Sequence, residues 1–211
     1  MNMKILIMTI KHKKSKGATI VILLLMVFVF ITDCSVIKKD NHISNDNYPS
    51  KDYNGQIWMT ENLKEIADSN DNKIKSYYPN DDTTNVKDYG LLYDYETACK
   101  VCPKGWHLPT EKEWENLIDF LGKQSGNELK DTLFWKSQEQ LFTNKSGFSV
   151  RPAGYANTEF DNLFKTHAIF WSATKVDTHF VKGFVLSITS DSIRSAPQHP
   201  AYGFSVRCVK N

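Results

Sequence analysis

The sequence predicts an α+β fold in which short antiparallel strands surround one central helix. A strongly signalled helix lies near the middle of the chain. The residues after 146 contain short apolar runs with strand-like alternation, separated by clusters of Gly, Pro, Asn and Asp. The chain has 211 residues, of which about 160 have a globular composition, and this length favours a single domain with one core.

The central helix is predicted to start at Thr110. Thr110 and Glu113 have the spacing of a capping box, in which each side chain binds the backbone amide of the other residue. Gly122 is typical of a helix end, because glycine adopts the left-handed conformation without strain. One apolar stripe at helical spacing predicts the buried face: Trp114, Leu117, Ile118 and Leu121.

Residues 1–34 are predicted to be a targeting segment. A lysine-rich stretch at 11–16 precedes an apolar run at 18–31, and Cys34 follows it. As a helix the run would be about 21 Å long, short of the roughly 30 Å of hydrocarbon in a bilayer. A removable signal therefore fits better than a permanent membrane span.

Cys34 is the candidate lipidation site, because a cysteine directly after the apolar run resembles a bacterial lipoprotein signal. Asp33 departs from that pattern, since the preceding residue is usually small and uncharged, so an uncleaved signal anchor is the alternative. Both readings place the domain outside the cytoplasm. Residues 35–54 are polar without an apolar period and are predicted to be a tether, which makes 55–211 the globular domain.

Ahead of the central helix, the sequence predicts a strand over Gly55–Leu63 with alternating apolar residues. Loops with one brief strand at Lys73–Tyr78 are expected between residues 68 and 88, and a short helix at Asp94–Lys100. Residues 123–146 predict another short helix and a loop. Five strands are expected after that: Phe148–Arg151, Ile169–Ala173, Phe180–Ile188, Ser192–Ala196 and Phe204–Lys210, with Ser190 and Asp191 in a hairpin turn.

The charge of the domain does not favour nucleic acid as a partner. The whole chain has a formal net charge of +2, but the first 33 residues hold five lysines and a single aspartate. The remainder carries 21 basic and 23 acidic side chains. A slightly acidic domain has no electrostatic footprint for nucleic acid.

Three motifs resemble the Fibrobacter succinogenes major paralogous domain family. They are Gly55–Leu63 (GQIWMTENL), Gly105–Glu115 (GWHLPTEKEWE) and Tyr202–Cys208 (YGFSVRC), and the resemblance covers roughly residues 53–210. The Leu-Pro-Thr turn into a Glu-Trp-Glu helix is more distantly similar to the formylglycine-generating enzyme family. This implies a single C-type-lectin-like domain. The first family is known mainly as envelope proteins without an assigned reaction.

The cysteines allow more than one pairing. An exported protein lies in an oxidising compartment, where cysteines can form disulfides. With Cys34 assigned to the signal, an odd number of cysteines remains: Cys99, Cys102 and Cys208. The resemblance implies a Cys102–Cys208 disulfide. Cys99-x-x-Cys102 is alternatively a redox pair or half of a zinc site, although no second Cys or His pair with matching spacing completes a zinc site.

No catalytic, metal-binding or cofactor motif is present. The histidines lack ligand spacing, and neither a phosphate-binding loop nor a nucleophile elbow occurs. Asp68, Asn70 and Asn72 imitate the start of a calcium loop, but Lys73 replaces its glycine and the closing glutamate is missing. The glutamates of the central helix are explained by capping and by the helix dipole. We therefore expect no enzymatic activity, no metal and no cofactor.

The remaining functional candidates are aromatic. Tyr155, Trp171, His199 and Tyr202 lie beside predicted loops near Pro and Gly, and are the candidate ligand-binding residues of a surface on which sugar rings or peptides stack.

Together these observations predict a lipid-anchored protein of the bacterial cell envelope, at the outer membrane or cell surface. Its domain is expected to bind a glycan or protein ligand without catalysis. Two alternatives are an oxidase like the formylglycine-generating enzymes and a structural module for envelope assembly.

Overall fold

The computed structural model describes residues 48–211 except 69, 71, 124, 136–141 and 158–161. All of the described residues belong to one compact unit. The predicted signal, Cys34 and most of the predicted tether lie outside the described residues. Within the described part of the chain, no helix has the length and apolar character needed to cross a membrane.

The described part of the domain contains two antiparallel sheets together with helices, which confirms the α+β class. The first has the strand order β1-β2-β7-β3, and the second has the order β4-β5-β6. Their bounds are β1 Ser50–Tyr53, β2 Gln56–Met59, β3 Trp106–His107, β4 His167–Lys175, β5 Val181–Ser187, β6 Arg194–Gln198 and β7 Val209–Lys210.

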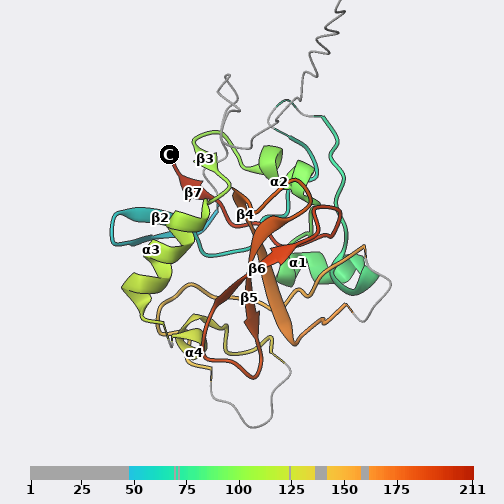
Figure 1. Cartoon of the computed structure of the whole chain (residues 1–211). Coiled ribbons are helices and arrows are strands. Elements are labelled where there is room, and N and C mark those ends of the chain that lie inside the picture. The colour runs from blue at the N-terminus through green and yellow to red at the C-terminus, as the bar shows by residue number, and fades with distance from the viewer. Residues whose placement is uncertain (1–47, 69, 71, 124, 136–141, 158–161) are drawn as a thin grey trace, which may run out of the picture. The chain divides into compact units, whose positions relative to one another are not determined.

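Among the residues that the structure describes, four α-helices accompany the sheets: α1 Val86–Tyr89, α2 Tyr95–Val101, α3 Glu111–Leu121 and α4 Gly126–Leu129. Two short 3₁₀ helices, Pro79–Asp81 and Thr83–Asn85, precede α1. α2 confirms the helix predicted at 94–100, and its N-cap Asp94 accepts a hydrogen bond from the Thr97 amide at 3.0 Å. α4 confirms the helix predicted within 123–146. α2 and α4 lie toward opposite ends of the β4–β6 sheet (Figure 1).

The central helix α3 forms as predicted. The Thr110 amide donates to Glu113 Oε2 at 2.7 Å, and the Glu113 amide donates to Thr110 Oγ1 at 3.3 Å, which completes the capping box. Gly122 ends the helix with φ of 93°. Trp114 is fully buried, as expected for the apolar stripe.

The core is divided into two main clusters that meet at β2. Trp58 and Met59 are both fully buried, but Trp58 belongs to the cluster around Trp114, and Met59 to the cluster around Trp171. Successive side chains of a strand point to opposite faces. The predicted alternation, with one face of this strand in the core, was therefore wrong for Trp58.

The tether prediction was wrong for its last residues, because Ser50–Tyr53 form β1. Three of these four residues are exposed, which gives them the composition of a tether, but Tyr53 is buried and pairs with Gln56 of β2. Asn54 and Gly55 form the turn with φ of 56° and 85°. The strand predicted over Gly55–Leu63 is correspondingly shorter and ends at Met59.

Three other predicted strands differ from the structure. Residues 148–151 form no strand and contribute one parallel bridge at Val150, because Gly147 and Ser149 have φ of 71° and 56°. The strand predicted at 73–78 is reduced to isolated bridges at its ends. The strand predicted at 204–210 is limited to Val209–Lys210, preceded by isolated bridges at 204 and 205.

Candidate functional site

Three of the four predicted ligand-binding residues form a cluster at the surface. Tyr202 has its ring centroid 6.2 Å from that of Tyr155 and 5.6 Å from that of His199. His199 is exposed, and both tyrosines are partly exposed. We call these three residues the aromatic cluster.

Trp171 does not belong to this surface, so its assignment as a surface residue was wrong. It lies on β4, is fully buried, and donates its Nε1 to the backbone oxygen of Tyr93 at 2.7 Å. Its ring packs 4.5 Å from Phe204 and 5.6 Å from Tyr95. Burial of Trp171 follows from β4 running through the core, which the sequence around it does not reveal.

Phe204 connects the aromatic cluster to the core. Its ring lies 6.2 Å from Tyr155 and 6.3 Å from Tyr202 on one side, and contacts Trp171 on the other. Two bridges fix its backbone, one between Tyr93 and Phe204 and one between Phe170 and Ser205. The cluster is therefore supported by a continuous column of aromatic rings reaching into the core.

Gly203, which follows Tyr202 of the cluster, lies close to Tyr77, a contact that sequence reasoning did not predict. A Cβ atom on Gly203 would lie 2.8 Å from Cδ2 of Tyr77 and 3.2 Å from Cβ of Ala156. Only glycine allows this approach at position 203. Its place in the Tyr202–Cys208 motif was the one available signal.

Polar groups of the cluster are available at its edge. The Ala201 amide donates to Nδ1 of His199 at 3.3 Å, so the neutral imidazole carries its proton on Nε2. Within the described part of the chain, the hydroxyls of Tyr155 and Tyr202 form no hydrogen bond. Asn157 lies at the same edge and donates its Nδ2 to the Ala201 oxygen at 2.6 Å.

The Cys102–Cys208 disulfide predicted by family resemblance is confirmed. It joins the C-cap of α2 to the segment before β7, with a Cα–Cα distance of 5.9 Å. Cys208 is fully buried. Cys99 lies outside the bridge and is partly buried. Because Cys102 is bonded to Cys208, it does not form a disulfide with Cys99 in this structure.

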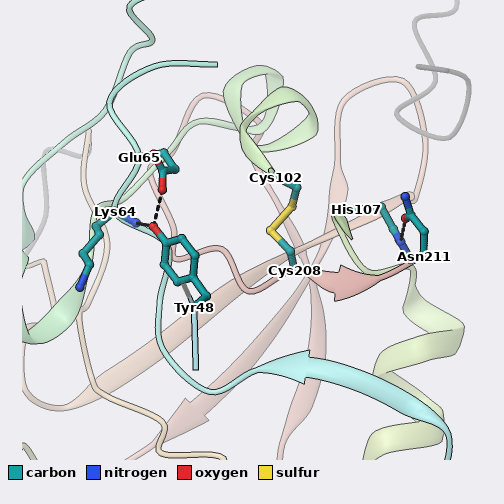
Figure 2. Close-up of a disulfide and its surroundings, with 7 residues drawn as sticks. All are labelled: Tyr48, Lys64, Glu65, Cys102, His107, Cys208 and Asn211. Carbon is teal, nitrogen blue, oxygen red and sulfur yellow. Dashed lines mark hydrogen bonds between the residues drawn. A yellow bond between two sulfur atoms is a disulfide. The ribbon is translucent and has the colours of Figure 1, made fainter. Parts of the chain in front are cut away.

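Two polar pairs flank the disulfide (Figure 2). On one side, Tyr48 donates its hydroxyl to Oε1 of Glu65 at 2.7 Å. On the other, His107 contacts Oδ1 of Asn211 through Nδ1 and Oε1 of Glu113 through Nε2, both at 2.7 Å. The hydrogen bond to Glu113 raises the pKa of His107, against the opposing effect of burial. This arrangement ties β3, α3 and the residue after β7 together.

The capping role predicted for Glu113 is confirmed, and Glu111 lies in the first turn of α3, as expected for interaction with the helix dipole. Glu111 pairs with Lys182 of β5 at 3.0 Å, and Glu113 caps α3 and binds His107. A hollow of about 480 Å³ at the C-terminal end of α3 contains one carboxylate, Glu128, which pairs with Lys145 at 3.5 Å. Its lining residues are Leu121, Gly122, Lys123, Ser125 and Glu128.

The loop that imitates a calcium site is closed by its own hydrogen bonds. Oδ1 of Asp68 accepts the amides of Asn70 and Asn72 at 2.8 and 3.0 Å. The side chain of Asn72 donates a further hydrogen bond to Oδ2 of Asp68 at 3.1 Å. This bond, followed by the two backbone bonds, lowers the pKa of Asp68. Among the described residues, no group of three or more His, Cys, Asp or Glu side chains is placed to hold a metal ion.

Comparison with known protein families matches residues 52–210 to the Fibrobacter succinogenes major domain. The match covers the whole described domain apart from its first few residues and Asn211. No curated protein and no solved structure matches the chain significantly.

Proposed function

The chain belongs to the Fibrobacter succinogenes major domain family, and we propose that this member is a cell-envelope lipoprotein whose domain binds a glycan without catalysing a reaction. The proposal also takes the domain to be C-type-lectin-like. Support for that fold comes from the pairing of β2, near the start of the domain, with β7 at its end.

The observation that carries the binding proposal is the aromatic cluster on its supporting column. Aromatic rings that the core holds in place lose little conformational freedom when a ligand stacks on them. Tyr155, His199 and Tyr202 combine ring faces with two hydroxyls and an imidazole N–H. A sugar ring is the complementary chemistry, because it has apolar C–H faces edged by hydroxyl groups.

The angles between the rings favour a soluble, twisted glycan chain over a flat polymer surface. The plane of Tyr202 is tilted by 43° from Tyr155 and by 50° from His199. One flat face cannot stack on all three rings at once. Successive sugars of a flexible chain can each meet one ring, because each glycosidic linkage allows rotation.

Titration calorimetry with soluble oligosaccharides tests this proposal. Tyr202→Ala should weaken binding by about tenfold or more, which is typical of an anchoring aromatic residue. Phe120→Ala is the matched control, because this side chain is 53% exposed on α3 and outside the cluster. A glycan that binds both variants equally well would show that the cluster is not the site. If the domain binds a protein and no glycan, the ligand is a protein and the glycan proposal is wrong.

The envelope location is proposed from the lysine-rich start, the short apolar run and Cys34, followed by a polar tether. Cys34→Ser should release the protein from membranes or stall its processing. Mass spectrometry of the wild-type N-terminus decides between lipoprotein and anchor. A membrane-bound protein that keeps residues 1–33 and carries no lipid would be a signal-anchored one.

The two alternatives have less support. Formylglycine-generating oxidases use a pair of reactive cysteines in the C-terminal part of the domain, whereas Cys208, the one cysteine there, is held in the disulfide. A structural module for envelope assembly does not require the polar groups available on the aromatic cluster.

A further inference from the structure

The turn between β1 and β2 contains the one Asn-Gly dipeptide of the sequence, Asn54–Gly55. Both residues are exposed and have positive φ, 56° at Asn54 and 85° at Gly55. No other atom would lie within 4 Å of a Cβ at position 55, so the turn is open to solvent. Its ends are set by the pairing of Tyr53 with Gln56.

Asn-Gly is the dipeptide in which an asparagine side chain reacts most readily with its own backbone, because glycine has no side chain to hinder the approach. The Gly55 nitrogen loses its proton and bonds to Cγ of Asn54, while the bond from Cγ to Nδ2 breaks and ammonia leaves. The resulting five-membered succinimide then takes up water. Opening at one carbonyl gives aspartate, and opening at the other gives isoaspartate.

We propose that Asn54 is a spontaneous deamidation site and that Asp52 controls its rate. The Gly55 amide donates to Oδ1 of Asp52 at 2.8 Å. A negative carboxylate at this distance opposes loss of the amide proton. The hydrogen bond also holds the Gly55 nitrogen in place, so that it cannot rotate freely toward Cγ of Asn54. The closed turn therefore protects Asn54, and opening of β1 exposes it to reaction.

Isoaspartate at position 54 would release β1. It adds one methylene to the backbone, and a two-residue connection with an added atom cannot keep Tyr53 opposite Gln56. β1 is the edge strand of its sheet, so its release leaves the pairing of β2 with β7 intact. The buried Tyr53 ring, 5.6 Å from Phe148, and the bond from Lys51 Nζ to the Ser146 oxygen at 2.7 Å would be lost.

The experiment incubates the purified protein at mildly alkaline pH, folded or in denaturant, and follows deamidation by peptide mass spectrometry. Trypsin releases residues 52–64 as one peptide, which contains Asn54 and the buried Asn62 as an internal control. Asn144 is a second control, because it also has positive φ but precedes lysine. Asn54 should react fastest of the three.

Asp52 variants test the control of the rate. Asp52→Ala should speed deamidation of the folded protein about two- to tenfold, the equivalent of one ordinary hydrogen bond. Asp52→Asn keeps an acceptor without the charge and should lie between the two. In denaturant, wild type and Asp52→Asn and Asp52→Ala should react alike and faster than the folded protein. Equal folded rates for wild type and Asp52→Ala, or equal folded and denatured rates for wild type, would overturn the proposal.

Limited proteolysis tests the release of β1. The isoaspartate form should be cut after Lys51 faster than the unmodified protein, whereas Asn54→Asp, which has the ordinary backbone, should be cut at the unmodified rate. If the isoaspartate form is cut no faster, the turn tolerates the added methylene and release of β1 is refuted.

Discussion

Arg207 donates Nη2 to the backbone oxygen of Ser149 at 2.7 Å. The pentapeptide Gly-Phe-Ser-Val-Arg occurs twice in the sequence, at 147–151 and at 203–207, and this bond joins the two copies. The same guanidinium donates Nη1 to the Phe148 oxygen and Nε to Oδ1 of Asn62 at 2.9 Å. Burial lowers the pKa of Arg207 to about 9, which leaves it charged at neutral pH. The second copy thus binds the backbone of the first through its arginine.

Replacing Arg207 should strongly destabilise the domain. Arg207→Met leaves three acceptors without their donor. The Phe148 oxygen and Oδ1 of Asn62 are buried, and the Ser149 oxygen is partly buried. Each buried acceptor that loses its donor costs about 1 to 3 kcal/mol. We expect a loss of at least about 2 kcal/mol in the free energy of unfolding, measured by denaturant titration. Arg151→Met is the matched control from the first pentapeptide, because Arg151 is only partly buried, and it should cost less. Equal losses for both variants would contradict a special role for Arg207.

Trp114 should be the residue of α3 on which stability depends most. Its ring lies 4.7 Å from Trp58 and stacks 5.0 Å from Phe184, at the centre of one core cluster. Trp114→Ala should lower the free energy of unfolding by about 3 to 5 kcal/mol. Phe120→Ala, on the exposed face of the same helix, should change it by less than about 0.5 kcal/mol. A Trp114→Ala variant with an unchanged melting curve would show that α3 does not organise the core.

The Cys102–Cys208 disulfide closes a loop across a sequence separation of 106 residues. In the chain-entropy model a loop of this length stabilises by about 4 to 5 kcal/mol, and measured values are often smaller. A Cys102→Ala/Cys208→Ala variant should show this loss in denaturant titration, and Cys99→Ser should not. Peptide mapping without reduction should find Cys102 joined to Cys208. A Cys99–Cys102 peptide would favour a redox role.

Local signals predicted the helices better than the strands. The start and end of α3 are set by the capping box and by Gly122, which are about a dozen residues apart in the sequence. Asp94 similarly marks the start of α2. Residues 148–151 have the composition of a strand. Arg207, nearly sixty positions later, donates hydrogen bonds to the carbonyl oxygens of Phe148 and Ser149. Such a long-range partner is invisible in a local pattern. The Asn54–Gly55 dipeptide, by contrast, is a strong local signal for a hairpin turn, and it indicates the pairing of β1 with β2.

The candidate site was predicted only in part, because the exposure of a side chain also depends on long-range contacts. Tyr155, His199 and Tyr202 were expected near loops and do meet at the surface. Trp171 has a similar sequence environment but lies on a strand that passes through the core. Whether an aromatic side chain is exposed depends on which elements cover it, and only the fold determines that.

The contact between His107 and Glu113 should make stability depend on pH near neutrality. The raised pKa of His107 means that the folded protein holds its proton more tightly than the unfolded chain does, whose histidine pKa is near 6.5. The stabilisation is therefore complete below about pH 6.5 and is lost as the pH rises through the raised value. For Glu113, burial acts to raise the pKa, but bonds from His107 and Thr110 outweigh it and lower it. Its contribution is present above about pH 4.5 and is lost in acid.

Denaturant titration across this range tests the contact. Wild type should lose stability as the pH rises from 6 to 8, as estimated from the ordinary histidine pKa, and His107→Gln should remove that loss. His179→Gln is the control, since His179 is exposed in the β4–β5 connection and its ring contacts Thr178; it should leave the pH profile unchanged. If His107→Gln and wild type have parallel profiles, the imidazole does not bind its proton more tightly in the folded state. The contact with Glu113 would then be a hydrogen bond of a neutral imidazole and not an ion pair.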